Sequence, residues 1–271
     1  MIPTNIACGS TVIETHSGLK MIVDPMQDPW VETSLYEHGT YEAGTLDVLK
    51  KFLRKGDTFI DAGANIGVMS LHASMHVGST GSVYSFEPVS ETYDILQKNI
   101  TLNECENINA VNVALGEYEG EAMMYKPNRS QASMIKQSEK YKEVQTATVK
   151  TLDQFIQEEG ITKVRMLKID VEGWELEVMK GASNLLNSSE LPILIVEYSS
   201  IRQLQRGRVF DIYKHILSLG TYRIFTLKEG KKSPSSFTEM ISEEDLPTHD
   251  NLFCYLPTCL GDPPTFLKQT S

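Results

Sequence analysis

The sequence predicts an α/β domain with a doubly wound, mostly parallel sheet. Short apolar, β-branched runs alternate with segments of helical periodicity along most of the chain. A glycine-containing turn, Asp61-Ala-Gly-Ala-Asn-Ile-Gly67, follows the first of these runs, and an acidic residue, Glu87, closes the next run. A strand, a glycine turn, a helix and a second strand ending in an acid are typical of a nucleotide-binding βαβ unit.

The first part of the chain predicts a cap followed by regular alternation. Residues 1–44 are expected to form an irregular N-terminal cap or extension, with a hairpin that pairs residues 12–14 and 20–23. Apolar periodicity and turn residues then predict helices at 44–54, 66–75 and 90–102, and strands at 58–60, 82–86 and 108–113.

The second part continues the alternation with some additions. Two added strands are expected at 121–125 and 146–149, on either side of a polar loop at 127–141. The remaining helices are predicted at 152–157, 174–186 (broken near Gly181) and 209–219, and the remaining strands at 164–169, 192–196, 222–227 and 251–256. Residues 228–250 read as a polar excursion. The predicted domain spans 45–257, and 258–271 form a C-terminal tail.

Composition limits the classes of function. The chain has 271 residues and a net charge of −11, which argues against general binding to nucleic acid or to an anionic membrane. The four cysteines are scattered, so neither a disulfide framework nor a zinc site is indicated. The longest apolar run, residues 191–196, is too short to span a bilayer. A cytoplasmic protein is therefore expected.

Polar residues follow the predicted parallel strands. Asp61, Glu87, Asn112, Asp170 and Glu197 each lie at or just past a strand's end. Ligands of open α/β sheets bind outside the carboxyl ends of the strands, at the point where strand order reverses. We therefore expect these side chains to share one rim of the sheet.

The glycine turn favours a nucleoside ligand without a phosphate. The dinucleotide pattern G-x-G-x-x-G lacks its middle glycine here, because the turn reads Gly63, Asn65, Gly67, and no phosphate-binding P-loop is present. S-adenosylmethionine fits such a turn. Asp61 and the turn would hold this cofactor, Glu87 would accept hydrogen bonds from its ribose, and Asn112 with Ala114 would read the adenine edge.

Several blocks together resemble one family. Phe59-Ile-Asp-Ala-Gly-Ala-Asn-Ile-Gly67, Phe86-Glu-Pro88, Thr151-Leu-Asp153 and Leu167-Lys-Ile-Asp-Val-Glu-Gly173, with Glu175 and Leu185, resemble the FkbM family of S-adenosylmethionine-dependent methyltransferases. The resemblance covers roughly residues 40–200. It implies a Rossmann-like, seven-stranded methyltransferase sheet with the last strand antiparallel, and O-methylation of hydroxyls on sugars, lipids or polyketides.

Two carboxylates are the candidates for catalysis. Asp170 and Glu172 are two residues apart, so in an extended segment both point to one side, Asp170 toward the methyl end of the cofactor and Glu172 toward the acceptor. Two close carboxylates raise one pKa, which suits a general base. A divalent cation such as Mg²⁺ held by Asp170, Glu172 and Glu197 is an alternative that we do not favour. His249 is a further candidate base on the acceptor side.

The acceptor is expected to be a small molecule or saccharide. Residues 127–145 and 228–250 are polar, Asn128–Ser133 offers hydrogen-bond donors, and Arg202, Arg206 and Arg208 form a local basic patch. Two other functions remain as alternatives: a nicotinamide-dependent Rossmann oxidoreductase, and a non-catalytic binding module with a methyltransferase-like fold. The oligomeric state is left open.

Overall fold

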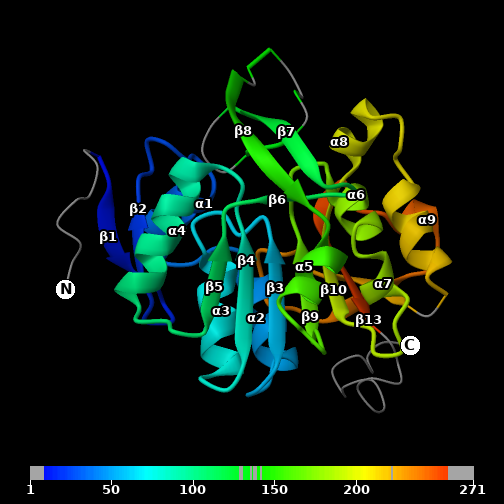
Figure 1. Cartoon of the computed structure of the whole chain (residues 1–271), viewed down its shortest axis with the longest axis horizontal. Helices are drawn as coiled ribbons and strands as arrows, with labels where there is room; N and C mark the ends of the chain where they lie inside the picture. The colour runs from blue at the N-terminus through cyan, green and yellow to red at the C-terminus, as the bar shows by residue number, and fades with distance from the viewer. Residues whose placement is uncertain are drawn as a thin grey trace.

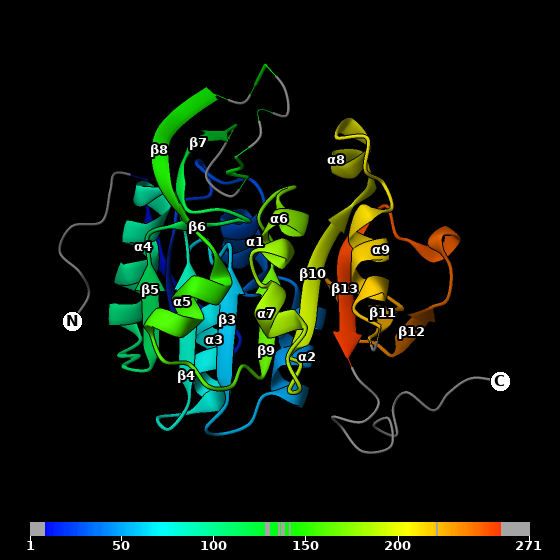
Figure 2. The ribbon, with the colours of Figure 1, turned by 45° about the vertical axis from the view of Figure 1, so that its right-hand side comes forward.

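A large sheet forms the centre of the molecule (Figures 1 and 2). The computed structural model describes residues 9–127, 131–134, 136, 139–140, 142–220 and 222–255. The sheet has eight strands in the order β12-β11-β13-β10-β9-β3-β4-β5. Their bounds are β3 Thr58–Ala62, β4 Ser82–Phe86, β5 Ile108–Val111, β9 Met166–Ile169, β10 Ile193–Ser199, β11 Arg223–Leu227, β12 Phe237–Met240 and β13 His249–Tyr255.

Strand directions confirm the predicted class. β5, β4, β3, β9 and β10 run parallel to one another. β13, the last strand, is antiparallel to both β10 and β11, as expected. β12 adds an eighth strand at the edge, inside the segment that was predicted to be a polar excursion. Only its terminal residue Met240 is buried, so its sequence carries too little apolar periodicity to predict a strand.

Helices cover both faces of the sheet (Figure 2). On one face lie α2 Ala43–Phe52, α3 Val68–Val77 and α4 Ser90–Leu102, and on the other lie α5 Leu152–Glu158, α6 Glu175–Lys180, α7 Ser183–Leu186 and α9 Asp211–Ser218. Phe59 and Ile60, neighbours in β3, are fully buried in opposite cores. Every residue of β10 is buried, which explains the continuous apolar run in its sequence.

The N-terminal cap is more regular than expected. β1 Thr11–Glu14 and β2 Lys20–Val23 form the predicted hairpin. An additional helix, α1 Val31–His38, follows it. Asn99 of α4 joins the cap to the domain, because its side chain accepts from the Ile22 N–H at 2.7 Å and donates to the Ile66 carbonyl at 2.9 Å. The predicted boundary between 44 and 45 falls inside α2, and the predicted tail 258–271 lies outside the described residues.

A small second sheet extends beyond the carboxyl ends of the central strands (Figure 1). It consists of β6 Ala114–Leu115, β8 Lys142–Lys150 and β7 Gly120–Lys126, in that order. Both added strands were predicted. α8 Ser200–Gln205 and the 3₁₀ turn Glu243–Asp245 complete the described elements. Among the residues that the structure describes, no helix combines the length and apolarity that a bilayer span requires.

Candidate functional site

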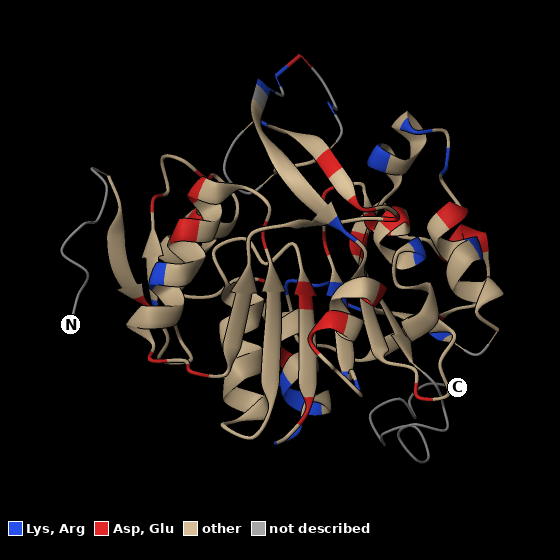
Figure 3. Cartoon of the chain, in the orientation of Figure 1, with Lys and Arg blue, Asp and Glu red and all other residues tan. Residues whose placement is uncertain are grey.

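A cavity of about 500 Å³ opens at the carboxyl ends of the central strands. Acidic and basic residues lie next to one another at these ends (Figure 3). The structure brings five predicted acids into the lining: Asp61, Glu87, Asp170, Glu172 and Glu197. They come from the ends of β3, β4, β9 and β10, so strand order alone assembles them.

Glu87 is held rigidly at one end of the cavity. Its side chain is buried, one carboxylate oxygen accepts from the Asn65 N–H and the other from the Val89 N–H, both at 3.0 Å. Asn65 has a φ of 51°, a left-handed conformation that Asn tolerates better than most residues. Burial raises the pKa of Glu87 to about 7. Each oxygen keeps capacity for another donor from the cavity.

The glycine turn is self-contained. The N–H groups of Gly63 and Ala64 both donate to the Phe86 carbonyl, and the Gly67 N–H donates to the Ala64 carbonyl. The Ile66 N–H donates to the Asn65 side chain at 2.7 Å. With Asn65 bound to Glu87, the turn offers no cradle of N–H groups for a phosphate.

Gly63 makes room for the protein itself. Its φ is +84°, and a Cβ at this position would lie 1.9 Å from the backbone oxygen of Asp170. The turn that contains Gly63 was expected to hold the cofactor. Gly63 does line the cavity. The space that a side chain would fill is occupied by the backbone of Asp170, directly after β9. Gly67 likewise accommodates Leu96, whose Cδ1 would lie 2.6 Å from an added Cβ.

Asp61 and Lys168 form the buried centre of the site. The Asp61 carboxylate is fully buried, accepts from the Ser70 hydroxyl at 2.6 Å and lies 3.7 Å from the Lys168 ammonium. The same ammonium lies 3.1 Å from Asp170. Burial alone would lower the pKa of Lys168, but Asp170 and Asp61 outweigh it and raise that pKa. Lys168 therefore stays charged.

Asp170 and Glu172 both line the cavity, and each has a cationic partner. Lys168 pairs with Asp170, and Arg202 of α8 pairs with Glu172. Burial and the nearby Glu197 raise the pKa of Asp170 to about 6. Burial and Glu197 also raise the pKa of Glu172 well above its ordinary value. Glu172 has a φ of 57°, so the backbone turns sharply just after Asp170.

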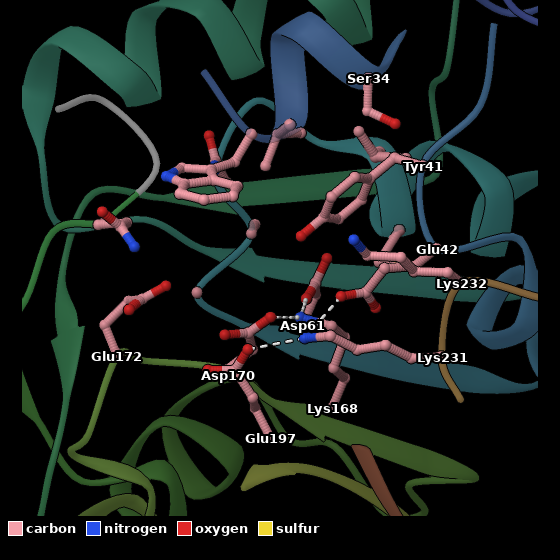
Figure 4. Close-up of a pocket in the computed structure, with 18 of the residues that line it drawn as sticks. Ser34, Tyr41, Glu42, Asp61, Lys168, Asp170, Glu172, Glu197, Lys231 and Lys232 are labelled. Atoms are coloured by element: carbon pink, nitrogen blue, oxygen red, sulfur yellow. Dashed lines mark hydrogen bonds and ion pairs between the residues drawn. The ribbon is translucent and has the colours of Figure 1, made fainter. Parts of the chain in front are cut away.

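Glu197 is the most heavily paired acid. It lies 2.8 Å from the Lys231 ammonium, 2.5 Å from the Arg202 guanidinium and 3.4 Å from Nε2 of His249. Burial would raise its pKa, but Lys231 and Arg202 outweigh burial and lower it. Lys231 also lies 2.8 Å from Glu42, which precedes α2 (Figure 4). Lys231 thus links the cap to β10.

The three carboxylates of the metal alternative do lie close together. Asp170, Glu172 and Glu197 offer carboxylate oxygens that all lie within 4.8 Å of one another. Each of the three is already paired with a lysine or an arginine. These cations supply the positive charge that a divalent ion would otherwise bring.

Other predicted residues lie away from the cavity lining. Asn112 donates to the carbonyls of Glu87 at 2.8 Å and Pro88 at 3.1 Å. It therefore stabilises the backbone at Glu87 without lining the cavity. Ala114 is buried in β6. Arg206 and Arg208, predicted to share a patch with Arg202, both pair with Glu177.

Sequence reasoning missed the contribution of the cap. Trp30, Ser34, Tyr41 and Glu42 line the cavity, and the Tyr41 hydroxyl points toward the charged cluster (Figure 4). Burial and the adjacent Glu42 raise the pKa of Tyr41 well above its ordinary value, so it keeps its proton. A Tyr-Glu pair directly before a predicted helix was the available signal. Of the predicted polar loop, Gln131 and Ala132 line the cavity, while residues 128–130 lie outside the described residues.

Two curated methyltransferases have sequences similar to part of this chain. Methyltransferase sdnD of Sordaria araneosa is 29% identical over 45% of this chain and 59% of its own length. The hexuronic acid methyltransferase AglP of Haloferax volcanii is 29% identical over 56% of this chain and 62% of its own length. The chain therefore spans about three fifths of the length of these curated relatives.

One solved methyltransferase structure and one family model also match the chain. An S-adenosylmethionine-dependent O-methyltransferase from Thermotoga maritima aligns with a TM-score of 0.45 and 15% identity, over 90% of this chain and 76% of that one. Residues 61–241 match the sequence model of the methyltransferase FkbM domain, which is well over half of the chain. The protein therefore belongs to the FkbM family of methyltransferases.

Proposed function

We propose that the protein transfers a methyl group from S-adenosylmethionine to a hydroxyl of a small-molecule or saccharide acceptor. Glu87 carries the proposal. It is a buried carboxylate at the end of β4, fixed by one backbone N–H on each oxygen, and it opens into the cavity. Two ribose hydroxyls can donate to the remaining positions of these oxygens.

The residues present fit this cofactor in size and charge. A cavity of about 500 Å³ lies within the range of small-molecule sites. Its lining around the centre holds five carboxylates against three cations, of which Lys168 and Lys231 are buried and Arg202 is partly exposed. The carboxylates are those of Glu42, Asp61, Asp170, Glu172 and Glu197. A ligand with a sulfonium and an ammonium group matches this excess of negative charge, and its approach would favour the ionised acids.

The same geometry disfavours a nicotinamide dinucleotide. A pyrophosphate needs free N–H groups or cations at the glycine turn. Here the N–H groups from Gly63 to Gly67 already donate within the protein. The family membership also argues against the oxidoreductase alternative.

The residues of the chain would position the cofactor and the acceptor, and one of them would accept the acceptor's proton. When bound with its ribose on Glu87, the cofactor would supply a methyl group on a positively charged sulfur, and the neutral thioether would be the leaving group. Asp170 faces the cavity with a pKa of about 6, so it is mostly ionised at neutral pH and can accept the proton from the acceptor hydroxyl. Lys168 holds that carboxylate in place at 3.1 Å, and Glu172, fixed by Arg202, would orient the acceptor.

The acceptor is proposed to be rich in hydroxyls. Ser34, Thr40, Tyr41 and Gln131 provide hydrogen-bonding groups around the cavity, and Trp30 provides an exposed ring at its edge. One curated relative is named for a hexuronic acid. Both observations support a saccharide over a purely apolar acceptor.

Calorimetry with S-adenosylhomocysteine tests cofactor binding. Glu87→Ala leaves two ribose hydroxyls without their acceptor and should weaken binding by about 1–3 kcal/mol, roughly ten- to a hundredfold. Glu91→Ala on α4 is the control, because its carboxylate is exposed, pairs with Lys126 and does not line the cavity. An unchanged affinity in folded Glu87→Ala would refute the assignment.

Labelled methyl donor tests the transfer. Saccharide, polyketide and fatty-alcohol acceptors are offered to the wild-type protein, and transfer to a saccharide is expected. Transfer confined to apolar acceptors would contradict the acceptor class. Cofactor binding without transfer to any acceptor would favour the non-catalytic alternative.

A further inference from the structure

The basic side chains around the cavity differ in how they are partnered. Lys168, Arg202 and Lys231 are buried or nearly so, and each lies within 4 Å of at least two carboxylates. Because the acids outnumber these cations, none of the three has positive charge to spare for an incoming anion. A ligand's carboxylate would meet net repulsion at the centre of the site.

The two histidines of the lining offer little more. His249 lies 3.4 Å from Glu197, and burial lowers its pKa, so its ring is neutral at physiological pH. His38 lies at the exposed end of α1 beside Glu37, 4.0 Å away. The glycine turn has no free N–H, as described above. An anion therefore finds few donors in this cavity.

Lys232 is the exception. Its side chain is exposed, lines the cavity and forms no ion pair within the part of the chain that the structure describes. In Figure 4 it extends into the cavity beside Glu42 and Tyr41. It is a charged lysine at the edge of an acidic site, available to a ligand.

The backbone that carries Lys232 is firmly anchored. The preceding residue, Lys231, donates its N–H to Asp250 at 2.9 Å and accepts from the Gly44 N–H at 3.0 Å. Its side chain is held between Glu42 and Glu197. Lys232 thus projects from a fixed base rather than from a free loop, which reduces the entropy lost when its ammonium pairs with a ligand.

We propose that Lys232 binds a carboxylate that a ligand brings into this cavity. The inference rests on the proposed function, which offers two sources for that group. One is the amino-acid carboxylate of the cofactor, and the other is a carboxylate on an acidic saccharide acceptor. The chemistry of recognition is the same, a charge-assisted hydrogen bond from an ammonium to a carboxylate.

The test compares Lys232→Met with Lys228→Met. Methionine keeps most of the apolar stem and removes the charge, and Lys228 is an exposed lysine nearby that does not line the cavity. Each variant is titrated with S-adenosylhomocysteine and with 5′-methylthioadenosine, which shares the adenosine and thioether but lacks the amino-acid part. Protein saturated with S-adenosylhomocysteine is then titrated with methyl glucuronoside and with neutral methyl glucoside.

Two results support the proposal and identify the source. If the carboxylate is the cofactor's, Lys232→Met lowers affinity for S-adenosylhomocysteine about tenfold and leaves that for 5′-methylthioadenosine unchanged. If it is the acceptor's, affinity for the glucuronoside falls about tenfold relative to the glucoside, with no change for either adenosine ligand. Lys228→Met should alter none of these affinities.

Two affinity ratios decide the test: S-adenosylhomocysteine over 5′-methylthioadenosine, and methyl glucuronoside over methyl glucoside. The proposal is overturned if Lys232→Met leaves both ratios within about twofold of wild type. It is also overturned if the wild type itself shows no preference for either carboxylate-bearing ligand. Its failure is separate from that of the proposed function. Binding of 5′-methylthioadenosine to the wild type reports on the adenosine site alone. Absence of binding for both 5′-methylthioadenosine and S-adenosylhomocysteine would refute the cofactor assignment itself.

Discussion

Replacing Gly63 by alanine should disturb both stability and cofactor binding. The new Cβ would be built 1.9 Å from the backbone oxygen of Asp170, whereas real Cβ atoms essentially never approach closer than 3.0 Å. β3 and β9 are paired next to this point, with the Asp170 N–H donating to the Ala62 carbonyl at 3.0 Å. Relief of the clash must therefore move the end of β9, and Asp170 moves with it.

The magnitude has two parts. A φ of +84° in a residue with a side chain costs about 1–2 kcal/mol. The overlap with backbone adds about 1–3 kcal/mol, as other overpacked sites do. Together they give about 2–5 kcal/mol, which lowers the melting temperature by roughly 5–20 °C in a domain of this size.

Gly18→Ala is the matched control. Gly18 has a φ of +81° but no atom within 4 Å of an added Cβ, so it isolates the conformational part. Scanning calorimetry of both variants separates the two contributions, and titration with S-adenosylhomocysteine should show weaker binding only in Gly63→Ala. Equal melting temperatures for the two variants would refute the described contact between Gly63 and the end of β9.

Four further outcomes are expected. Because burial raises the pKa of Asp170 to about 6, lowering the pH from 7.5 to 5 should weaken binding of the sulfonium cofactor more than binding of its neutral thioether product, as measured by calorimetry. Burial lowers the pKa of His72 from 6.5, so the unfolded chain binds the extra proton as the pH falls below about 6.5; urea titrations should show stability lost there, and less of it in His72→Gln. Asn251→Ala removes two buried hydrogen bonds, to Glu42 at 3.0 Å and Thr45 at 2.9 Å, and should cost about 1–3 kcal/mol in the same assay. A chelator should leave methyl transfer within about twofold, whereas a large loss restored by Mg²⁺ would establish the metal alternative.

The sequence predicted those parts of the fold that depend on local pattern. The unbroken apolar run of β10 is buried on both sides, and the alternation of strands and helices defines the doubly wound order. α1 escaped prediction because its eight residues bury only Val31, Glu32 and Leu35. β12 escaped because a four-residue edge strand with two exposed residues has no clear period.

The site was predictable where topology fixes it. Asp61, Glu87, Asp170 and Glu197 meet because parallel strands end on the same rim. Their partners were not predictable. Lys231 contacts both Glu42 and Glu197, and such pairing between distant segments depends on how the cap folds over the sheet.

The position of β13 has a consequence for how the protein is made. β13 lies between β10 and β11, although the chain passes through β11 first. Until residues 249–255 leave the ribosome, β10 and β11 have unpaired edges facing a gap, which are templates for wrong pairing. Until then Glu42 also lacks the hydrogen bond from Asn251, which lies 209 residues later in the chain. A chain cut just before His249 would therefore contain every residue of the matched family domain and still have an open sheet and an incomplete cavity wall.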